Sequence, residues 1–560
     1  MESGQILQNR FEDNINNRKI DSERKHNLKH STKIQNFIFS KRNINSSFFN
    51  KNINNKENDT NEYAFNSDLI NNNISQVIYL FEKIHQDNSI SLTKNQINEI
   101  KKVLLDYLTK IRKELSKDNI SIIQAKNIFN TDKTKIFCEL LINPINDTYD
   151  PFIYLESIWI INNLMFLVAK FKELILFDIT DITKYLIQFL INIYKNQKDD
   201  GVKYTLEEKV LRIFGNLLYI NNNILNLFID YSIIPFIIES LNSPIPSFRI
   251  SCLWIINKML LTIKKNGNNE IIPLFTTKTA ISNYKFILSR IKNQNSIDEI
   301  SELFWIFNEL VKYDSSIIIY IFFYDINKKQ NNNLSNLNEE YIINTFQFIV
   351  DNCFINKILQ PSFRLISNLL IICYKDIKNE YLLSKLVQIL FEKQTFFRYI
   401  NELMYSQKNT FDISFTIDIL LLIFNLVSFS PINSKAYFKN GIINLINNKE
   451  YLNNQDIQQM LLFIYYKMMK NNSFYFESND ETVIKSCLNL IQIYKVNNNI
   501  LYILIDLFYF YLKASNIHIG ENIENELNIL INTKENNANN NLIFILMELS
   551  NLIQMKFNLI

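Results

Sequence analysis

Hydrophobic residues recur along most of the chain with the spacing of one face of an α-helix. From about Ser75 onward, apolar positions fall at i, i+3, i+4 and i+7 within long segments that short polar clusters separate. The ends of these segments carry Asn, Asp or Lys in place of Gly. The pattern predicts an all-α protein. Its clearest segments are Ile97–Arg112, Leu155–Lys170, Leu206–Leu218, Phe248–Lys264, Ile297–Val311 and Phe363–Tyr374.

One type of helical segment recurs, with a large residue at its centre and an Asn about one turn later. We call the large residue the central residue of its segment. The copies are SIWIINNL (Trp159, Asn163), VLRIFGNL (Arg212, Asn216), CLWIINKM (Trp254, then Asn257–Lys258), LFWIFNEL (Trp305, then Asn308–Glu309), SFRLISNL (Arg364, Asn368) and ILLLIFNL (Leu421, Asn425), with MLLFIYYKM (Phe463, Lys467) as a last copy that has Lys in place of Asn. Central residues are 53, 42, 51, 59, 57 and 42 positions apart. The shorter spacings match helical repeats of about 40–47 residues, so the segments predict a solenoid in which each unit packs only on its neighbours.

The composition agrees with a helical chain and argues against several other classes. Six glycines and eight prolines in 560 residues are too few for the many tight turns of sandwiches and barrels. Five widely spaced cysteines in apolar segments predict buried free thiols, and the four histidines show no grouping typical of zinc sites. The start of the chain lacks a signal-peptide core, and the longest apolar runs are too short to span a membrane. We expect a soluble intracellular protein without a metal or cofactor.

Charge is concentrated at the N-terminus. Residues 1–50 hold nine basic and five acidic residues, whereas the remainder holds 50 basic and 51 acidic ones. Such an arm is typical of segments that bind acidic surfaces, nucleic acid or membranes. The predicted organisation is a basic arm (1–45), an Asn-rich linker (46–75) and a helical solenoid (76–560). The cations of the arm are Arg18, Lys19, Arg24, Lys25, Lys29, Lys33, Lys41 and Arg42.

The recurring segment carries the candidate chemistry, because a residue and its i+4 neighbour lie on one face of a helix. If equivalent helices line one side of the solenoid, the central residues and the following Asn residues form a ladder. The aliphatic parts of ligand Lys or Arg side chains can then lie between large flat side chains, which attract the charged groups through cation–π interactions. The Asn amides can hydrogen-bond to the backbone of an extended peptide. All three tryptophans of the chain fall on this ladder.

In these features the chain resembles the importin-α family of nuclear-import adaptors, whose armadillo repeats carry Trp and Asn four residues apart. FIYLESIWIINNLM resembles the first-repeat segment, PSFRLISNLL the fifth, and SCLNLIQIYKVNNNILYILIDLFYFYLK the penultimate one. The basic arm, which closes with FSKRN, is similar to the importin-β-binding segment. The resemblance implies a right-handed superhelix of about ten armadillo repeats after the arm.

The resemblance also implies partners and roles. The arm would bind importin-β, and with importin-β absent its Lys41 and Arg42 would occupy the groove. A small GTPase would release importin-β, a nuclear export receptor would recycle the adaptor, and the protein would shuttle between cytoplasm and nucleus. The cargo would be proteins with basic nuclear localisation signals. The implied cargo residues are Trp159, Trp254 and Trp305 as walls, Asn163 and Asn216 as backbone contacts, Glu302 as an acidic contact, and Arg364, Asn368 and Asn425 in a smaller second site.

The sequence departs from the family pattern at several positions of the ladder. Arg212 replaces the second-repeat Trp, Lys258 replaces an Asn, an acidic position falls at about Ile220, and both second-site tryptophans are replaced, by Leu421 and Phe463. These changes predict weaker or altered recognition of basic cargo.

Simpler interpretations remain open beside the ladder. The tryptophans could be core residues, the Asn residues could serve the helix array, and Arg212 and Lys258 could be ordinary surface charges. The whole could be an armadillo scaffold for cytoskeletal or signalling partners, or, less well supported by the neutral body, a helical repeat bound to RNA or membrane. No phosphate-binding loop or catalytic motif supports an enzyme, and we expect neither direct nucleic-acid binding nor membrane insertion.

Overall fold

The computed structural model describes residues 65–470, with gaps of which 323–338 and 430–440 are the longest, together with residues 504–507 and 509. The predicted arm, most of the predicted linker and most of the chain after Lys470 lie outside the described residues. All the regular secondary structure in the described part is helical, which confirms the all-α prediction. The chain divides into two compact units, Met1–Tyr313 and Asp314–Ile560, which are described separately below.

Twelve helices of unit 1 fall within the described residues. They are α2 (Ser67–Gln86), α3 (Lys94–Leu115), α4 (Ile122–Phe129), α5 (Asp132–Ile142), α6 (Pro151–Lys170), α7 (Ile179–Asn196), α8 (Gly201–Ile220), α9 (Ile224–Asp230), α10 (Ile233–Ser240), α11 (Pro246–Asn266), α12 (Lys278–Leu288) and α13 (Ile297–Leu310), and a 3₁₀ helix, η2 (Asn269–Thr276), precedes α12.

Local signals in the sequence account for several helix ends. Thr93 and Gln96 form a reciprocal capping box at the start of α3. Asp150 accepts hydrogen bonds from the first free amides of α6, whose first residue is Pro151. Helix α11 ends at Gly267, which adopts φ 73°, a left-handed conformation that glycine tolerates without steric cost. Threonine and aspartate caps thus begin α3 and α6, whereas α11 ends on one of the few glycines of the chain.

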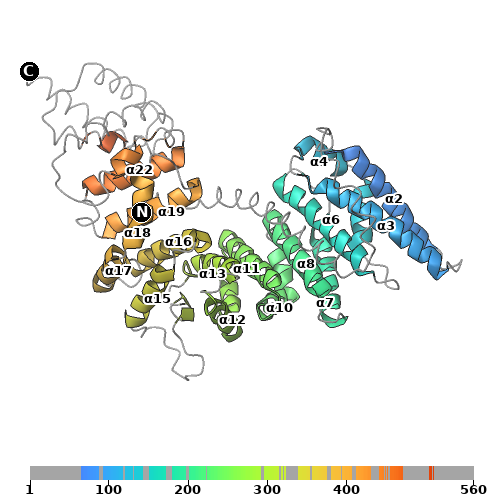
Figure 1. The fold of residues 1–560 in the computed structure, drawn as a ribbon, viewed down its shortest axis with the longest axis horizontal. Helices are drawn as coiled ribbons and strands as arrows, with labels where there is room; N and C mark the ends of the chain where they lie inside the picture. Colours follow the sequence, from blue (N-terminus) through green and yellow to red (C-terminus); the bar gives the residue numbers. More distant parts are fainter. Residues whose placement is uncertain are drawn as a thin grey trace, which may run out of the picture. The chain divides into compact units, whose positions relative to one another are not determined.

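The segments with a central residue pack side by side, in chain order, in one layer of unit 1. Helices α3, α6, α8, α11 and α13 each contact the next one in this series (Figure 1). Their contacts advance together along neighbouring helices. Arg112 of α3 meets Glu156 of α6, and four residues later Ser116 meets Asn163. Trp159 of α6 likewise meets Lys209 of α8, and Asn162 meets Asn216 further along both helices. Helices α3, α6 and α8 are therefore parallel. We call the five helices of this layer the ladder helices.

A second layer covers one side of the ladder helices. Helices α2, α5, α7, α10 and α12 each pack on a ladder helix, and successive members of this layer also contact one another in the pairs α2–α5, α5–α7 and α10–α12 (Figure 1). Apolar residues fill the space between the layers, among them Phe137, Phe214, Phe228 and Phe304, which are all fully buried. Each helix thus buries its apolar face against immediate neighbours, so a long chain needs no single large core.

Unit 2 repeats part of this arrangement. Its described helices are α15 (Glu339–Asn352), α16 (Asn356–Ile372), α17 (Glu380–Glu392), α18 (Gln394–Tyr405), α19 (Ile413–Phe429) and α22 (Gln455–Lys470). Helices α16, α19 and α22 carry the last three copies of the recurring segment, and α19 packs between the other two. Contacts from Gln360 to Ser414 and from Arg364 to Asp418 advance together, so α16 and α19 are parallel.

All six helices predicted from the periodic pattern are present, but one predicted boundary is wrong. The linker was expected to extend to residue 75, whereas α2 begins at Ser67. Ile70, Ile74 and Val77 of this Asn-rich segment are buried at 0%, 1% and 0% exposure. Three apolar residues with helical spacing are enough to anchor the helix, although Asn surrounds them.

One described helical stretch, Phe152–Lys170 in α6, has the length and apolar composition of a membrane span, and 61% of it is buried inside the structure. Burial by neighbouring helices accounts for this composition. Among the described residues, Cys138, Cys252 and Cys373 are buried and free, and burial raises the pKa of the Cys138 thiol to about 12. Buried thiols with a raised pKa are unreactive.

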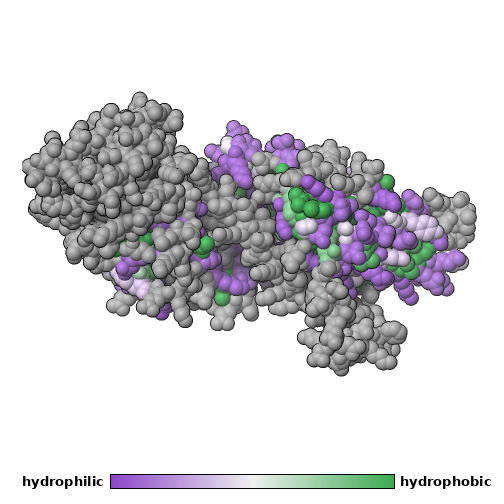
Figure 2. Space-filling view, turned by 90° about the horizontal axis from the view of Figure 1, so that it is seen from above, coloured by the Kyte–Doolittle hydropathy of each residue, from purple (hydrophilic) through white to green (hydrophobic). Residues whose placement is uncertain are grey.

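The outer surface of the N-terminal helices carries scattered apolar side chains. Leu69 and Tyr79 of α2 and Val103 of α3 are 41%, 57% and 46% exposed. In the space-filling view, hydrophobic side chains over this end of unit 1 lie in small groups among hydrophilic ones (Figure 2). Scattered exposure of this kind is common on folded proteins and does not define a site.

One buried hydroxyl in unit 1 leads to a stability prediction. Tyr284 of α12 is fully buried against Phe307, and its hydroxyl has no hydrogen-bond partner among the described residues. Burial raises the pKa of Tyr284 well above its usual value. Because an unsatisfied buried polar group is costly, Tyr284→Phe should raise the free energy of unfolding by about 1 kcal/mol. Urea unfolding followed by tryptophan fluorescence measures this, with the exposed Tyr79→Phe as a neutral control. A loss of stability would show that the hydroxyl is hydrogen-bonded.

Candidate ligand-binding face

The predicted ladder residues of unit 1 lie on the ladder helices, and most of them fall on the partly exposed stripe of their helix. We call this surface the ladder face. Its partly exposed members include Trp159 and Asn163 of α6, Asn216 of α8, and Glu302 and Trp305 of α13. Arg212 and Trp254 are 9% and 7% exposed, so they contribute little surface.

Trp159 lies between cations that the chain itself supplies. The guanidinium carbon of Arg112, on α3, lies 4.6 Å from the centroid of the Trp159 ring. The amine of Lys209, on α8, lies 4.4 Å from the same centroid. Because α6 packs between α3 and α8, the cations reach Trp159 from both neighbouring helices. Arg112 and Lys209 are only 4% and 2% exposed, so these cation–π contacts are largely shielded from water.

Trp254 packs against the preceding ladder helix at a position where a glycine leaves room for its ring. An added Cβ at Gly215 of α8 would lie 2.1 Å from Cζ3 of Trp254 and 2.3 Å from Cη2. The indole therefore lies directly on the α8 backbone, and only glycine leaves room for it. The Lys258 amine lies 5.3 Å from the ring centroid of Trp254, one turn away on the same helix. For Trp254 the structure thus favours core packing over a wall that is open to a ligand.

The asparagines of the ladder connect neighbouring helices. The Asn163 amide donates to the Ser116 hydroxyl at 3.0 Å, and the Asn216 amide donates to Oδ1 of Asn162 at 3.4 Å. In unit 2 the Asn425 amide donates to the Ser367 hydroxyl at 2.6 Å. In each case the acceptor belongs to the preceding ladder helix or lies at its end. At least one donor of each amide therefore serves the helix array, which supports the simpler interpretation of these residues.

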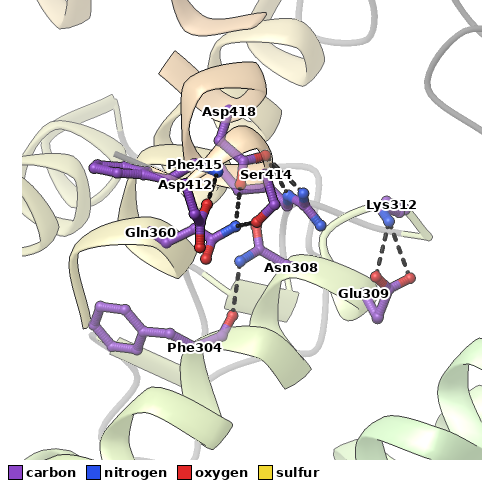
Figure 3. A network of polar contacts seen from close by, with 10 residues as sticks. Phe304, Asn308, Glu309, Lys312, Gln360, Asp412, Ser414, Phe415 and Asp418 are labelled. Carbon is purple, nitrogen blue, oxygen red and sulfur yellow. Dashed lines mark hydrogen bonds and ion pairs between the residues drawn. The ribbon is translucent and has the colours of Figure 1, made fainter. Parts of the chain in front are cut away.

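Arginines form the other recurring connection between consecutive helices. Arg112 of α3 pairs with Glu156 of α6, and the central residue Arg364 of α16 pairs with Asp418 of α19. Each acid lies three positions before the central residue of its own helix. The Arg364–Asp418 distance is 2.7 Å, and Asp418 also accepts a hydrogen bond from Gln360 (Figure 3). Burial raises the pKa of Asp418, and the charge of Arg364 opposes this shift.

The three residues of the predicted second site are buried in unit 2. Arg364, Asn368 and Asn425 are 8%, 4% and 4% exposed. The structure therefore places them inside the helix stack, where Arg364 and Asn425 join α16 to α19.

Arg212 differs from Arg112 and Arg364. The equivalent position on the next ladder helix, three before Trp254, is Ser251 and offers no carboxylate. Arg212 pairs instead with Glu208 of its own helix at 3.3 Å. Arg212 in place of the second-repeat Trp was expected to alter the recognition of basic cargo, and the structure buries its charge beside a carboxylate.

Glu302 lies at the position that Glu156 and Asp418 occupy on their helices, three residues before a central residue. It is partly exposed, as is Trp305 one turn later on α13. This pair is the part of the predicted cargo site in which an acidic residue and an aromatic residue are both partly exposed in unit 1, although Oε2 of Glu302 is itself buried.

Sequence reasoning missed Arg112, Lys209 and Asp418, although they contact the predicted ladder residues Trp159 and Arg364. They could have been found as charged residues within otherwise apolar helix faces, because such positions are occupied only when a partner is present. Lys209 sits three positions before the central Arg212, which is the same offset as that of Glu156 and Asp418. A search for complementary residues at this offset would have identified the contacts.

The buried Lys209 predicts a specific dependence of stability on pH. Burial lowers its pKa to about 8; Glu208 opposes this shift, whereas Arg212 and Arg112 add to it. Between pH 8 and 10.5 the unfolded state then binds more protons than the folded state, so stability rises with pH. Relative to Lys209→Met, the wild-type protein should gain roughly 3 kcal/mol of unfolding free energy across this window. Urea titrations of both proteins at pH 7, 8.5 and 10 measure the difference, and a constant difference would contradict the prediction.

Other features of the described part offer no competing site. A small hollow between α2, α3, α5 and α6 is lined mostly by apolar side chains such as Phe81 and Leu104. Its acid, Asp150, already caps α6. Within the described residues, no cluster of three or more His, Cys, Asp or Glu side chains is arranged to hold a metal ion.

Comparison with known proteins leaves the family open. No protein-family model matches the sequence, and no curated protein matches it. The crystal structure of one engineered protein aligns with a TM-score of 0.48 at 10% identity and covers 86% of this chain and 99% of that chain. A second engineered protein aligns with a TM-score of 0.33 at 11% identity and covers 52% of this chain and 96% of that chain. Similarity this low carries no argument about function.

Proposed function

We propose that the protein is a non-catalytic nuclear-import adaptor, built as an armadillo-type solenoid, that holds cargo peptides on the ladder face and binds importin-β through its basic arm. The observation that carries the proposal is the series of packed ladder helices, on which Trp159 and Trp305 lie partly exposed at equivalent positions. Stacked helical repeats commonly present such a layer as an extended binding surface. The arm (1–45) adds the charge that an acidic receptor surface would attract.

Binding of the full-length protein to purified importin-β tests this proposal. The matched control is a full-length variant in which the eight arm cations are replaced by serine, because it keeps the helical body unchanged. We expect saturable binding by the wild-type protein that weakens with salt, and at least tenfold weaker binding by the variant. Equal binding by the two proteins, or no saturable binding by the wild-type protein, would rule out the adaptor function.

A second candidate function is an armadillo scaffold for partners outside nuclear transport, such as cytoskeletal or signalling proteins. Two observations favour it: the cations against Trp159 come from the chain itself, and Trp254 is packed on Gly215. Both reduce the surface available for ligand lysines. Two negative results together would favour the scaffold: no binding of a basic localisation peptide by the helical body, and no binding of importin-β by the arm.

A further inference from the structure

Cations of the chain itself already lie against the Trp159 ring, where the charged group of a cationic ligand would bind. A ligand Lys or Arg would place its charged head over an indole ring at about 4–6 Å. Lys209 and Arg112 hold these positions at 4.4 and 4.6 Å. Both belong to the helices that flank α6, so their positions are fixed by the helix array and do not depend on a mobile loop.

An ion pair holds Arg112, and burial confines Lys209. Arg112 pairs with Glu156, which lies one turn before Trp159 on α6. Lys209 follows Glu208 in sequence, and the charge of Glu208 favours its protonated form. Because Lys209 is 2% exposed, its displacement by a soluble cation would require a rearrangement of α8. A cation from solution therefore competes with one that is preorganised and shielded from water.

We propose that Lys209 and Arg112 occupy the cation positions at the Trp159 ring permanently. They would determine specificity by excluding cationic ligand side chains from this ring. The inference rests on the proposed ladder-face function and sharpens it. An extended peptide bound to unit 1 would not need a lysine at the position that contacts Trp159. Its cationic contacts would lie toward α13, where Glu302 and Trp305 are partly exposed.

Fluorine NMR of the full-length protein labelled with 5-fluorotryptophan tests the inference without a known cargo. The chain has three tryptophans, so three resonances are expected, and single Trp→Phe variants assign them. Tetramethylammonium chloride serves as the cation probe, sodium chloride at equal concentration as the ionic-strength control, and free 5-fluorotryptophan as the positive control. The expected result is no saturable shift of the Trp159 resonance in the wild-type protein. A saturable shift would overturn the inference.

Variants at Lys209 make the test independent of whether peptides bind at all. Lys209→Ala opens one side of the ring, so the Trp159 resonance should now shift saturably with the probe, while the other two signals report that the fold is intact. A silent Trp159 resonance in the folded variant would contradict the inference.

If Lys209→Ala does not fold, the volume-conserving Lys209→Met provides a second measurement. Raising the pH through 8 should move the Trp159 resonance of the wild-type protein as the amine over it loses its charge, and this movement should be absent from Lys209→Met. Identical titrations in the two proteins would overturn the proposal. Neither result depends on importin-β binding, so failure of the inference and failure of the adaptor function are distinguishable.

Discussion

Replacing Arg249 with methionine is expected to lower the free energy of unfolding of unit 1 by about 3–5 kcal/mol. Arg249 of α11 donates to both carboxylate oxygens of Glu299 of α13, at 2.7 and 2.9 Å, and to the carbonyl of Ser243. Arg249 and Glu299 are 3% and 0% exposed. Among the described residues, the buried Glu299 without Arg249 keeps the longer contact to Arg290 at 3.6 Å, so an almost uncompensated charge remains in the interior.

Two companion variants separate this explanation from a general loss of packing. The double variant Arg249→Met with Glu299→Leu removes both charges and should recover most of the lost stability. Lys110→Met breaks an exposed pair with Asp106 and should change stability by less than about 0.5 kcal/mol. All three tryptophans lie in unit 1, so the fluorescence change in urea reports on this unit. A single variant as stable as wild type, or a double variant no better than the single, would contradict the explanation.

Gly215→Ala is expected to destabilise unit 1 by about 3 kcal/mol, although alanine is the better helix former. A glycine inside a helix costs about 1 kcal/mol relative to alanine, so its presence in the middle of α8 needs a packing reason. That reason is Trp254, whose Cζ3 atom would lie 2.1 Å from the new Cβ. Helix α8 and the indole would have to separate, and overpacking of this kind commonly costs 1–3 kcal/mol or more.

Coupling to Trp254 is the feature that tests the packing explanation. In a Trp254→Leu background the added methyl group no longer meets the indole, so Gly215→Ala should there be neutral or stabilising. A double-mutant cycle should therefore give a coupling energy of about 3 kcal/mol or slightly more. Gly267→Ala is the control, since no atom lies within 4 Å of its added Cβ and only its φ of 73° is strained. Additive effects of the Gly215 and Trp254 substitutions would contradict the contact.

The sequence predicted the fold class and the ladder helices because both depend on local signals. The apolar spacing in segments such as Phe248–Lys264 is a property of one helix. The recurrence of one segment type is visible in the sequence without any knowledge of which helices are in contact. The start of α2 at Ser67 was missed because Asn-rich composition concealed three well-spaced apolar residues. The division at Tyr313 depends on contacts between distant segments, which periodicity does not record.

The candidate site was harder to predict for a physical reason. Sequence identifies which residues share a helix face, but the partner of a side chain depends on how far neighbouring helices are shifted along their axes. That shift places Lys209 over Trp159 and Glu156 beside Arg112, whereas sequence reasoning assigned the Trp159 ring to a ligand. For the same reason Arg364 was expected at a peptide site and is instead paired with Asp418. Residues at complementary offsets on successive repeats are thus more informative than single central residues.

The predicted arm lies outside the described residues, so its role remains a proposal that depends on binding measurements. The ladder face can be tested without the arm's influence, because the full-length variant with serine in place of the eight arm cations removes any competition by Lys41 and Arg42. The natural probe is an extended peptide with a basic localisation sequence, since a carboxylate and an indole, Glu302 and Trp305, remain partly exposed on α13. Trp305 is therefore the ring on which the ladder-face proposal depends most.

Titration of such a peptide into the arm-neutralised protein and into the same protein with Trp305→Ala tests the central claim most directly. Isothermal titration calorimetry gives both affinities, and circular dichroism confirms that the variant is folded. Because a well-placed aromatic anchor commonly contributes 2 kcal/mol or more to binding, the substitution should weaken binding at least tenfold. Equal affinities for the two proteins would contradict the claim that the ladder face is the ligand-binding surface.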